Sequence, residues 1–87
     1  MKQEYYWYYR TIGTNIGRFR RESGMTQEEL AEAVDLSSDY ISHLEALGTL
    51  KAPSLDTLIA ISEALDIPLY RLVMMEGDEE ERAKAGR

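Results

Sequence analysis

The chain has 87 residues, of which 10 are basic and 16 acidic, so its formal net charge is −6. At about 100–200 residues per domain, this length allows one domain. Cysteine is absent and histidine occurs once, which excludes disulfides and thiol catalysis and argues against a metal site. We expect no metal and no cofactor.

No apolar run approaches the roughly 18 residues of a membrane span, and no signal-peptide pattern opens the chain. We therefore expect a cytoplasmic protein that does not bind a membrane. The acidic balance argues at first against nucleic acid as a partner. However, the first 24 residues carry a net charge of +3, because five basic residues stand against Glu4 and Glu22. Screening over a Debye length of about 8 Å hides acidic groups that lie on the far side of a small domain.

Residues 5–9 read YYWYY, and we take residues 1–9 as an aromatic N-terminal arm. Five consecutive aromatic side chains cannot all face one core. Three roles remain open: packing over the edge of the domain, self-association through large rings with polar tips, or an arm that reaches into DNA. The candidate self-association residues are Tyr5, Tyr6, Trp7, Tyr8 and Tyr9.

Helical patterns fill the next segment. A first helix is predicted from about Arg10 to Glu22, with Gly24 just past its end. A second helix follows Thr26, which has the three-residue spacing of a capping box with Glu29. The inward face of the first helix would hold Ile12, Ile16 and Phe19, and that of the second Leu30, Ala31 and Val34.

A third helix is predicted from near Ser37 to about Leu47, a fourth from Pro53–Ser54 to about Asp66, and a short fifth from Pro68. Their apolar residues are Ile41 and Leu44 in the third, Leu55, Leu58, Ile61 and Leu65 in the fourth, and Leu69, Leu72 and Val73 in the fifth. No segment alternates with period two, so the predicted fold class is all-α, a compact five-helix bundle. Residues 77–87 have no large apolar residue, and we expect a flexible charged tail there.

The connection between the second and third helices is short. Only Asp35 and Leu36 separate Val34 from Ser37, which makes two helices cross steeply, as in a helix-turn-helix. The face of the third helix opposite its apolar residues holds short or hydrogen-bonding side chains, namely Ser38, Asp39, Ser42, His43 and Ala46. Such side chains favour a helix that is pressed against a partner, because a solvated face usually carries long charged residues.

Two segments resemble the Xre/Cro phage-repressor-like helix-turn-helix family: IGTNIGRFRRESGMTQEELAEAVDLSSDYISHLE at residues 12–45 and PSLDTLIAISEALDIPLYRLV at 53–73. The motifs are TQEELA on the second helix, S-x-x-x-I-S-x-x-E on the third and P-S-L-x-T-L on the fourth. The resemblance implies a lambda-repressor-like DNA-binding domain at residues 10–76. It also implies that a homodimer binds double-stranded DNA with the third helix in the major groove.

The resemblance implies roles for individual residues. Base edges would face Ser38, Asp39, Ser42 and His43, although a surface histidine without function is an alternative for the last. Contacts to the DNA backbone would come from Thr26, Gln27, Ser37, Thr49 and Lys51, and local charge adds Arg18 and Arg21. Arg20 and Glu45 correspond to a structural ion pair that links the first and third helices, for which we expect a role in the fold.

The family often dimerises through its fifth helix, so Leu69, Leu72 and Val73 form a second candidate dimer surface; an ordinary core-facing stripe is the alternative. We expect a small transcriptional regulator, most simply a repressor, that binds a palindromic operator, similar to phage repressors and restriction–modification controller proteins. The alternative is a protein-interaction module with the same fold that binds an antagonist or an antitoxin-type partner. No nucleophile has a base at helical spacing, so we expect no enzyme.

Overall fold

The computed structural model describes residues 3–46 and 52–75. Within these ranges the chain forms a short 3₁₀ turn, five α-helices and no strand, which confirms the predicted all-α bundle. The elements are η1 (Gln3–Tyr5), α1 (Tyr6–Glu22), α2 (Gln27–Ala33), α3 (Ser38–Glu45), α4 (Leu55–Ala64) and α5 (Tyr70–Val73). Thr49, Lys51, the charged tail and Leu47, the predicted end of the third helix, lie outside the described residues.

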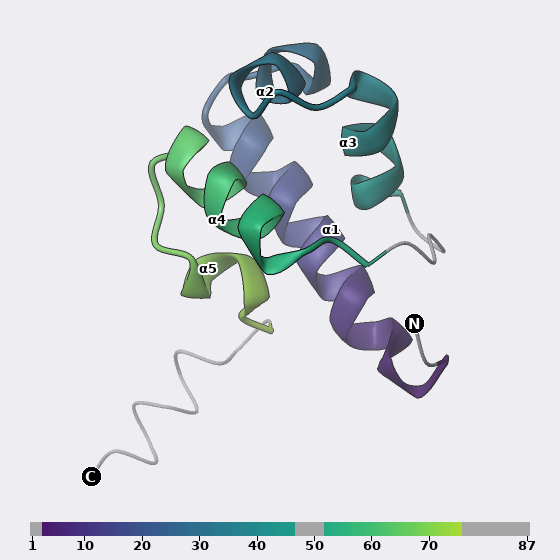
Figure 1. The fold of residues 1–87 in the computed structure, drawn as a ribbon. Helices are drawn as coiled ribbons and strands as arrows, with labels where there is room; N and C mark the ends of the chain where they lie inside the picture. The colour runs from purple at the N-terminus through teal and green to yellow at the C-terminus, as the bar shows by residue number, and fades with distance from the viewer. Residues whose placement is uncertain (1–2, 47–51, 76–87) are drawn as a thin grey trace, which may run out of the picture.

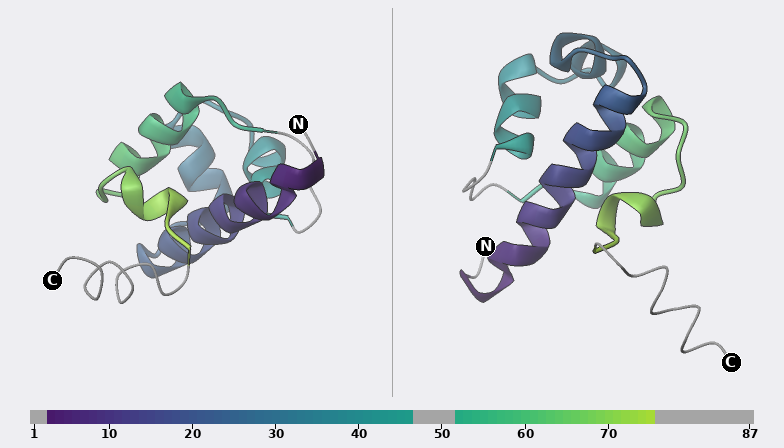
Figure 2. Two further views of the ribbon diagram at one scale, coloured as in Figure 1. Left: turned by 90° about the horizontal axis from the view of Figure 1, so that it is seen from below. Right: turned by 180° about the vertical axis from the view of Figure 1, so that it is seen from behind.

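Helix α1 runs the length of the molecule (Figure 1), with α3 on one side of it and α4 and α5 on the other (Figure 2). It begins at Tyr6, so the predicted start at Arg10 was four residues too late. Aromatic residues have modest helix propensity, which is why the sequence pattern did not extend the helix through them. In the structure Tyr8, Tyr9 and Ile12 line a groove that is also lined by Leu55 and Leu58 of α4.

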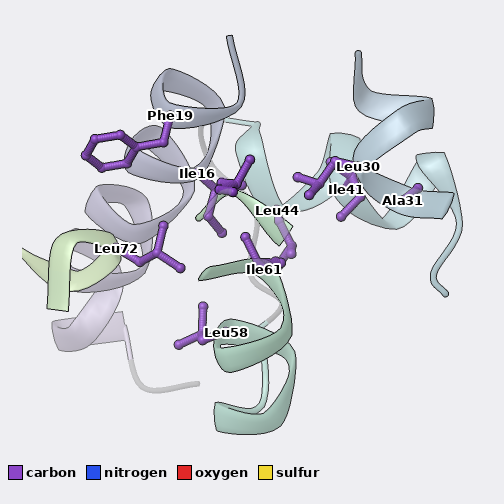
Figure 3. Close-up of a cluster of buried hydrophobic side chains, with 10 residues drawn as sticks. Ile16, Phe19, Leu30, Ala31, Ile41, Leu44, Leu58, Ile61 and Leu72 are labelled. Atoms are coloured by element: carbon purple, nitrogen blue, oxygen red, sulfur yellow. The ribbon is translucent and has the colours of Figure 1, made fainter. Parts of the chain in front are cut away.

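All five α-helices contribute to a single apolar core (Figure 3). Its buried members are Ile16 and Phe19 of α1, Leu30 and Ala31 of α2, Ile41 and Leu44 of α3, Leu58, Ile61 and Leu65 at α4, and Leu72 of α5. Ile12 and Val34 are partly buried against this core, as predicted. Leu55 differs, because it lies in the first turn of α4 and remains 61% exposed.

Three helices end with the same backbone motif. After α1, α2 and α4, the chain passes through a residue with positive φ, and the N–H of the following residue donates to the carbonyl oxygen five residues before it. The residues with positive φ are Gly24, Asp35 and Asp66. At the other ends, Ser37 and Ser54 cap α3 and α4, and Thr26 forms the predicted capping box with Glu29. Local sequence therefore defines most of the helix boundaries.

Two contacts fix other helices on α1. At Gly13 the backbone of α3 comes so close that a Cβ atom would overlap the carbonyl oxygen of Leu44. On the α5 side, the buried amide of Asn15 donates to the carbonyl oxygens of Leu72 and Met74 over 3.0 and 2.8 Å. Helix α1 is thus the scaffold that sets the position of α3.

Candidate nucleic-acid interface

Helices α2 and α3 are joined by the four residues Val34–Ser37. Asp35 has a φ of 57°, and the N–H of Leu36 bonds to the carbonyl oxygen of Ala31 over 2.9 Å, so the chain reverses immediately after α2. The Ser37 hydroxyl then accepts the N–H of Tyr40 and begins α3. Figure 1 looks nearly along α2 while α3 runs across the view, which agrees with the predicted steep crossing.

The outward face of α3 is polar and accessible. Asp39, Ser42 and His43 are exposed, whereas Ser38 is half-buried. On the opposite face, Ile41 and Leu44 are buried in the core. The four residues predicted to face DNA bases therefore share one side of one helix, and none of them has a long side chain.

The residues predicted to contact the DNA backbone have different surroundings. Arg18 and Arg21 are exposed on α1, and the guanidinium of Arg18 lies over the ring of Phe19 at 4.6 Å. Thr26 and Ser37 are exposed, and both hydroxyl oxygens accept capping hydrogen bonds. Gln27 is half-buried, and its side-chain amide already donates to Glu45.

A sequence profile described as helix-turn-helix matches residues 16–72. The matched segment begins within α1, ends within α5 and contains α2, the turn and α3. The chain belongs to the helix-turn-helix family. Its relatives include a phage immunity repressor, which confirms the predicted Xre/Cro-like character.

This helix-turn-helix protein is 37% identical over 62 residues to y4dJ, an uncharacterised HTH-type transcriptional regulator of Sinorhizobium fredii; the match covers 71% of this chain and 78% of the relative. It is 38% identical over 63 residues to the immunity repressor of Bacillus phage phi105, covering 72% of this chain but only 42% of the repressor. The crystal structure of the restriction–modification controller protein C.AhdI from Aeromonas hydrophila superposes with a TM-score of 0.73 at 27% identity, over 80% of this chain and 99% of that one. These relatives are regulators rather than enzymes, in agreement with the sequence-based expectation.

In the helix-turn-helix protein, Arg20 of α1 and Glu45 of α3 form a two-pronged ion pair. Arg20 Nε donates to Glu45 Oε2 over 2.7 Å, and Arg20 Nη2 donates to Oε1 over 3.0 Å. The side chains are only 11% and 9% exposed. The hydrogen bond and the attraction of the carboxylate raise the pKa of Arg20, although burial opposes them. Because the pair is nearly buried, removal of one partner should cost several kcal/mol of folding free energy.

The two predicted dimer surfaces differ in accessibility. Leu72 is completely buried, so it belongs to the core, and Leu69 packs partly against that core. Of the three α5 candidates only Val73 is exposed. In the aromatic segment, Trp7 and Tyr8 are both 60% exposed, Tyr5 is 45% exposed, and Tyr6 and Tyr9 are half-buried.

The groove beside this aromatic segment was not predicted from the sequence. It has a volume of about 540 Å³ and lies between the start of α1 and the start of α4. Its lining residues are Tyr5, Tyr8, Tyr9, Ile12, Pro53, Leu55 and Leu58. The spacing of Tyr5, Tyr8, Tyr9 and Ile12 on one helical face was the available signal.

Within residues 3–46 and 52–75, no group of three or more His, Asp or Glu side chains is arranged to hold a metal ion. In the same part of the chain, every helix is too short or too polar to cross a bilayer.

Proposed function

We propose that this helix-turn-helix protein is a transcriptional regulator, most simply a repressor, that binds a specific double-stranded DNA sequence as a homodimer. Helix α3 enters the major groove. The observation that carries the proposal is the face of α3, where Asp39, Ser42 and His43 present short hydrogen-bonding groups to solvent. A major groove about 12 Å wide admits an α-helix, and each base pair displays a distinct pattern of donors and acceptors there.

Individual side chains on this face match base-edge chemistry. Asp39 can accept a hydrogen bond from the amino group of cytosine, and His43 and Ser42 can bond to purine edges. A carboxylate near phosphates lowers affinity, so the contribution of Asp39 is discrimination between sequences. Ser38 lies in the first turn of α3, and the N-terminal residues of a recognition helix are those that contact base edges, which supports a base contact for Ser38.

Phosphate contacts come from a small set of groups. Arg18 and Arg21 supply charge from α1, and Gln27, Thr26 and Ser37 supply hydrogen-bonding groups near the turn. Since exposed charges interact over about 8 Å at physiological salt, the net charge of −6 weakens binding without preventing it.

The proposal includes a homodimer, because dimeric helix-turn-helix proteins bind two half-sites with matching symmetry. We assign the dimer surface to the aromatic start of α1 rather than to α5. The exposed rings of Trp7 and Tyr8 support this assignment, and the burial of Leu72 removes one α5 candidate. The exposed Leu55 extends the apolar surface onto α4.

Selection of bound sequences from a random duplex pool tests this function. We expect enrichment of a palindrome whose half-site centres lie about 34 Å apart, or a multiple of this spacing. If folded protein enriches no sequence, the protein-interaction alternative replaces this proposal.

Substitution on α3 separates the two functions. Ser38→Ala combined with His43→Ala should weaken operator binding by about tenfold or more per half-site, because base-edge hydrogen bonds are lost. Ser23→Ala, an exposed serine at the end of α1, is the matched control and should leave the affinity unchanged. Unchanged operator binding by the α3 variant would remove α3 as the reading helix.

A further inference from the structure

The carboxylate of Glu45 connects three helices rather than two. Its Oε1 atom accepts the Nη2 hydrogen of Arg20 over 3.0 Å and the Nε2 hydrogen of Gln27 over 3.1 Å. Arg20, Gln27 and Glu45 come from α1, α2 and α3, respectively. The ion pair therefore also holds the side chain of a residue that we propose as a DNA contact.

This contact determines which way the Gln27 amide faces. An ionised carboxylate has only acceptor atoms, so Gln27 must turn its NH₂ group, and not its carbonyl oxygen, toward Glu45. That nitrogen carries two hydrogens, and one of them bonds to Glu45. The second has no partner among the described residues, and the side chain is half-exposed. A donor is thus left for a group outside the protein.

The carboxylate that orients Gln27 is itself firmly held. Arg20 Nη1 donates to the carbonyl oxygen of Met25 over 2.8 Å, which fixes the guanidinium from its other side. A Cβ atom at Gly17 would lie 3.1 Å from Glu45 Oε1, so the backbone of α1 closes the space beneath it. Arg20 and Glu45 therefore have little freedom to move.

We propose that Arg20 and Glu45 are positioning residues that direct the second Nε2 hydrogen of Gln27 at a phosphate oxygen of DNA. This inference rests on the proposed function, since DNA supplies the phosphate. A side chain that is already fixed loses less conformational freedom when it binds. Because the amide is neutral, it displaces no counterion, so it adds affinity without steepening the salt dependence. The contact adds the same affinity on every duplex sequence.

A double-mutant cycle on operator affinity tests the coupling. Glu45→Gln keeps the size of the side chain but leaves one acceptor oxygen for three donors, so the Gln27 amide loses its fixed orientation. We expect Gln27→Ala and Glu45→Gln each to weaken binding by about tenfold. The double variant should bind the operator no more weakly than whichever single variant has the lower affinity. The slope of log affinity against log salt should be the same for all of these variants. Fluorescence anisotropy at a temperature where circular dichroism shows every variant folded gives these affinities.

Arg18→Ala is the matched control, because Arg18 is an exposed candidate phosphate contact that makes no hydrogen bond or ion pair with Glu45 among the described residues. The fold-loss of operator affinity caused by Arg18→Ala should multiply with the fold-loss caused by Glu45→Gln when the two are combined. Arg18→Ala should also make the salt dependence of the affinity shallower. If the fold-losses of affinity for Gln27→Ala and Glu45→Gln also multiply in the double variant, the two residues act independently and the inference is overturned.

A second measurement needs no change at Glu45. The chain has three side-chain amides, in Gln3, Asn15 and Gln27, so three NH₂ pairs appear in a ¹⁵N correlation spectrum. The Gln27 pair, assigned through its loss in Gln27→Ala, should shift when operator duplex is added, while the pair of the buried Asn15 should not. A Gln27 pair that stays in place while α3 backbone signals shift overturns the inference alone. If the unchanged chain binds no duplex, the proposed function fails and the inference fails with it.

Discussion

Asn15 is a polar residue within an otherwise apolar interface. Its side chain is 7% exposed, and its Nδ2 atom donates to the carbonyl oxygens of Leu72 and Met74. These two carbonyls lie at the end of α5, where no further helical turn supplies N–H donors. Asn15 shares a helical face with Ile12 and Phe19, so its inward position was predictable from periodicity. Its partners were not, because they are 57 and 59 residues away along the chain.

We expect Asn15→Asp to lower the free energy of unfolding by about 3 kcal/mol at neutral pH, because a buried carboxylate would face two carbonyl oxygens without a donor. Urea denaturation followed by circular dichroism measures this loss. Part of the stability should return at low pH, where the protonated carboxyl can donate one hydrogen bond. Asn15→Ala is the control, because it removes the donors without adding charge; equal losses at all pH values would contradict the explanation.

Two glycines of α1 allow α3 to approach closely. Gly13 lies against the backbone of Leu44, and Gly17, four residues later, lies beneath the carboxylate of Glu45. Both are buried and occur inside a helix, where glycine normally costs about 1 kcal/mol relative to alanine. Close packing of two elements is the reason that this cost is tolerated, and the helical pattern alone did not indicate it.

Gly13→Ala should therefore destabilise the protein by about 2–3 kcal/mol, since overpacking against a backbone atom forces α1 and α3 apart. The shift in thermal midpoint by circular dichroism measures the effect. Gly17→Ala should cost less, because its Cβ would lie 3.1 Å from the nearest atoms instead of overlapping a backbone atom, and one of these atoms, Arg21 Nη1, ends a flexible side chain. The opposite order of the two variants, or stabilisation by Gly13→Ala, would contradict the close packing of α1 and α3.

At the scale of the whole molecule, the aromatic start of α1 is the surface that we propose for self-association. Tyr8 and Leu55, from helices far apart in the chain, line one groove and are both about 60% exposed. Tyr8→Ser combined with Leu55→Ser should shift the protein from dimer to monomer, because the interface loses apolar contacts at its centre. Sedimentation equilibrium measures the mass. Ile59→Ser, at an exposed apolar residue of α4 that does not line the groove, is the control and should leave the dimer intact; a monomeric unchanged chain would contradict the proposed dimer.

The charge of the whole molecule predicts a shallow salt dependence of DNA binding. Arg20 is held by Glu45, which leaves Arg18, Arg21 and Lys51 in each subunit as candidate phosphate contacts. Six such contacts in a dimer, at about −0.9 each, correspond to a slope of log affinity against log salt no steeper than about −5.4. Titrations at several salt concentrations measure the slope. A value of about −8 or steeper would require contacts beyond these residues.

The amino-acid sequence by itself determined the all-α class, the helix-turn-helix, the helix caps and the polar face of α3. These features depend on local chemistry: on hydroxyl groups that cap helices, on apolar spacing of three and four residues, and on short connections. The predicted start of α1 was wrong because aromatic residues have modest helix propensity, so the local pattern stopped four residues short of the observed start at Tyr6.

Only the tertiary structure decided which candidates share a surface. It brings Gln27 to the Arg20–Glu45 pair, places Leu72 in the core and joins the aromatic segment to Leu55 across a groove. Such contacts depend on how whole helices pack, and side chains separated by tens of residues carry no local signal of their partners. Periodicity predicts which face of a helix points inward, whereas the packing of the helices decides which residues of other helices contact that face.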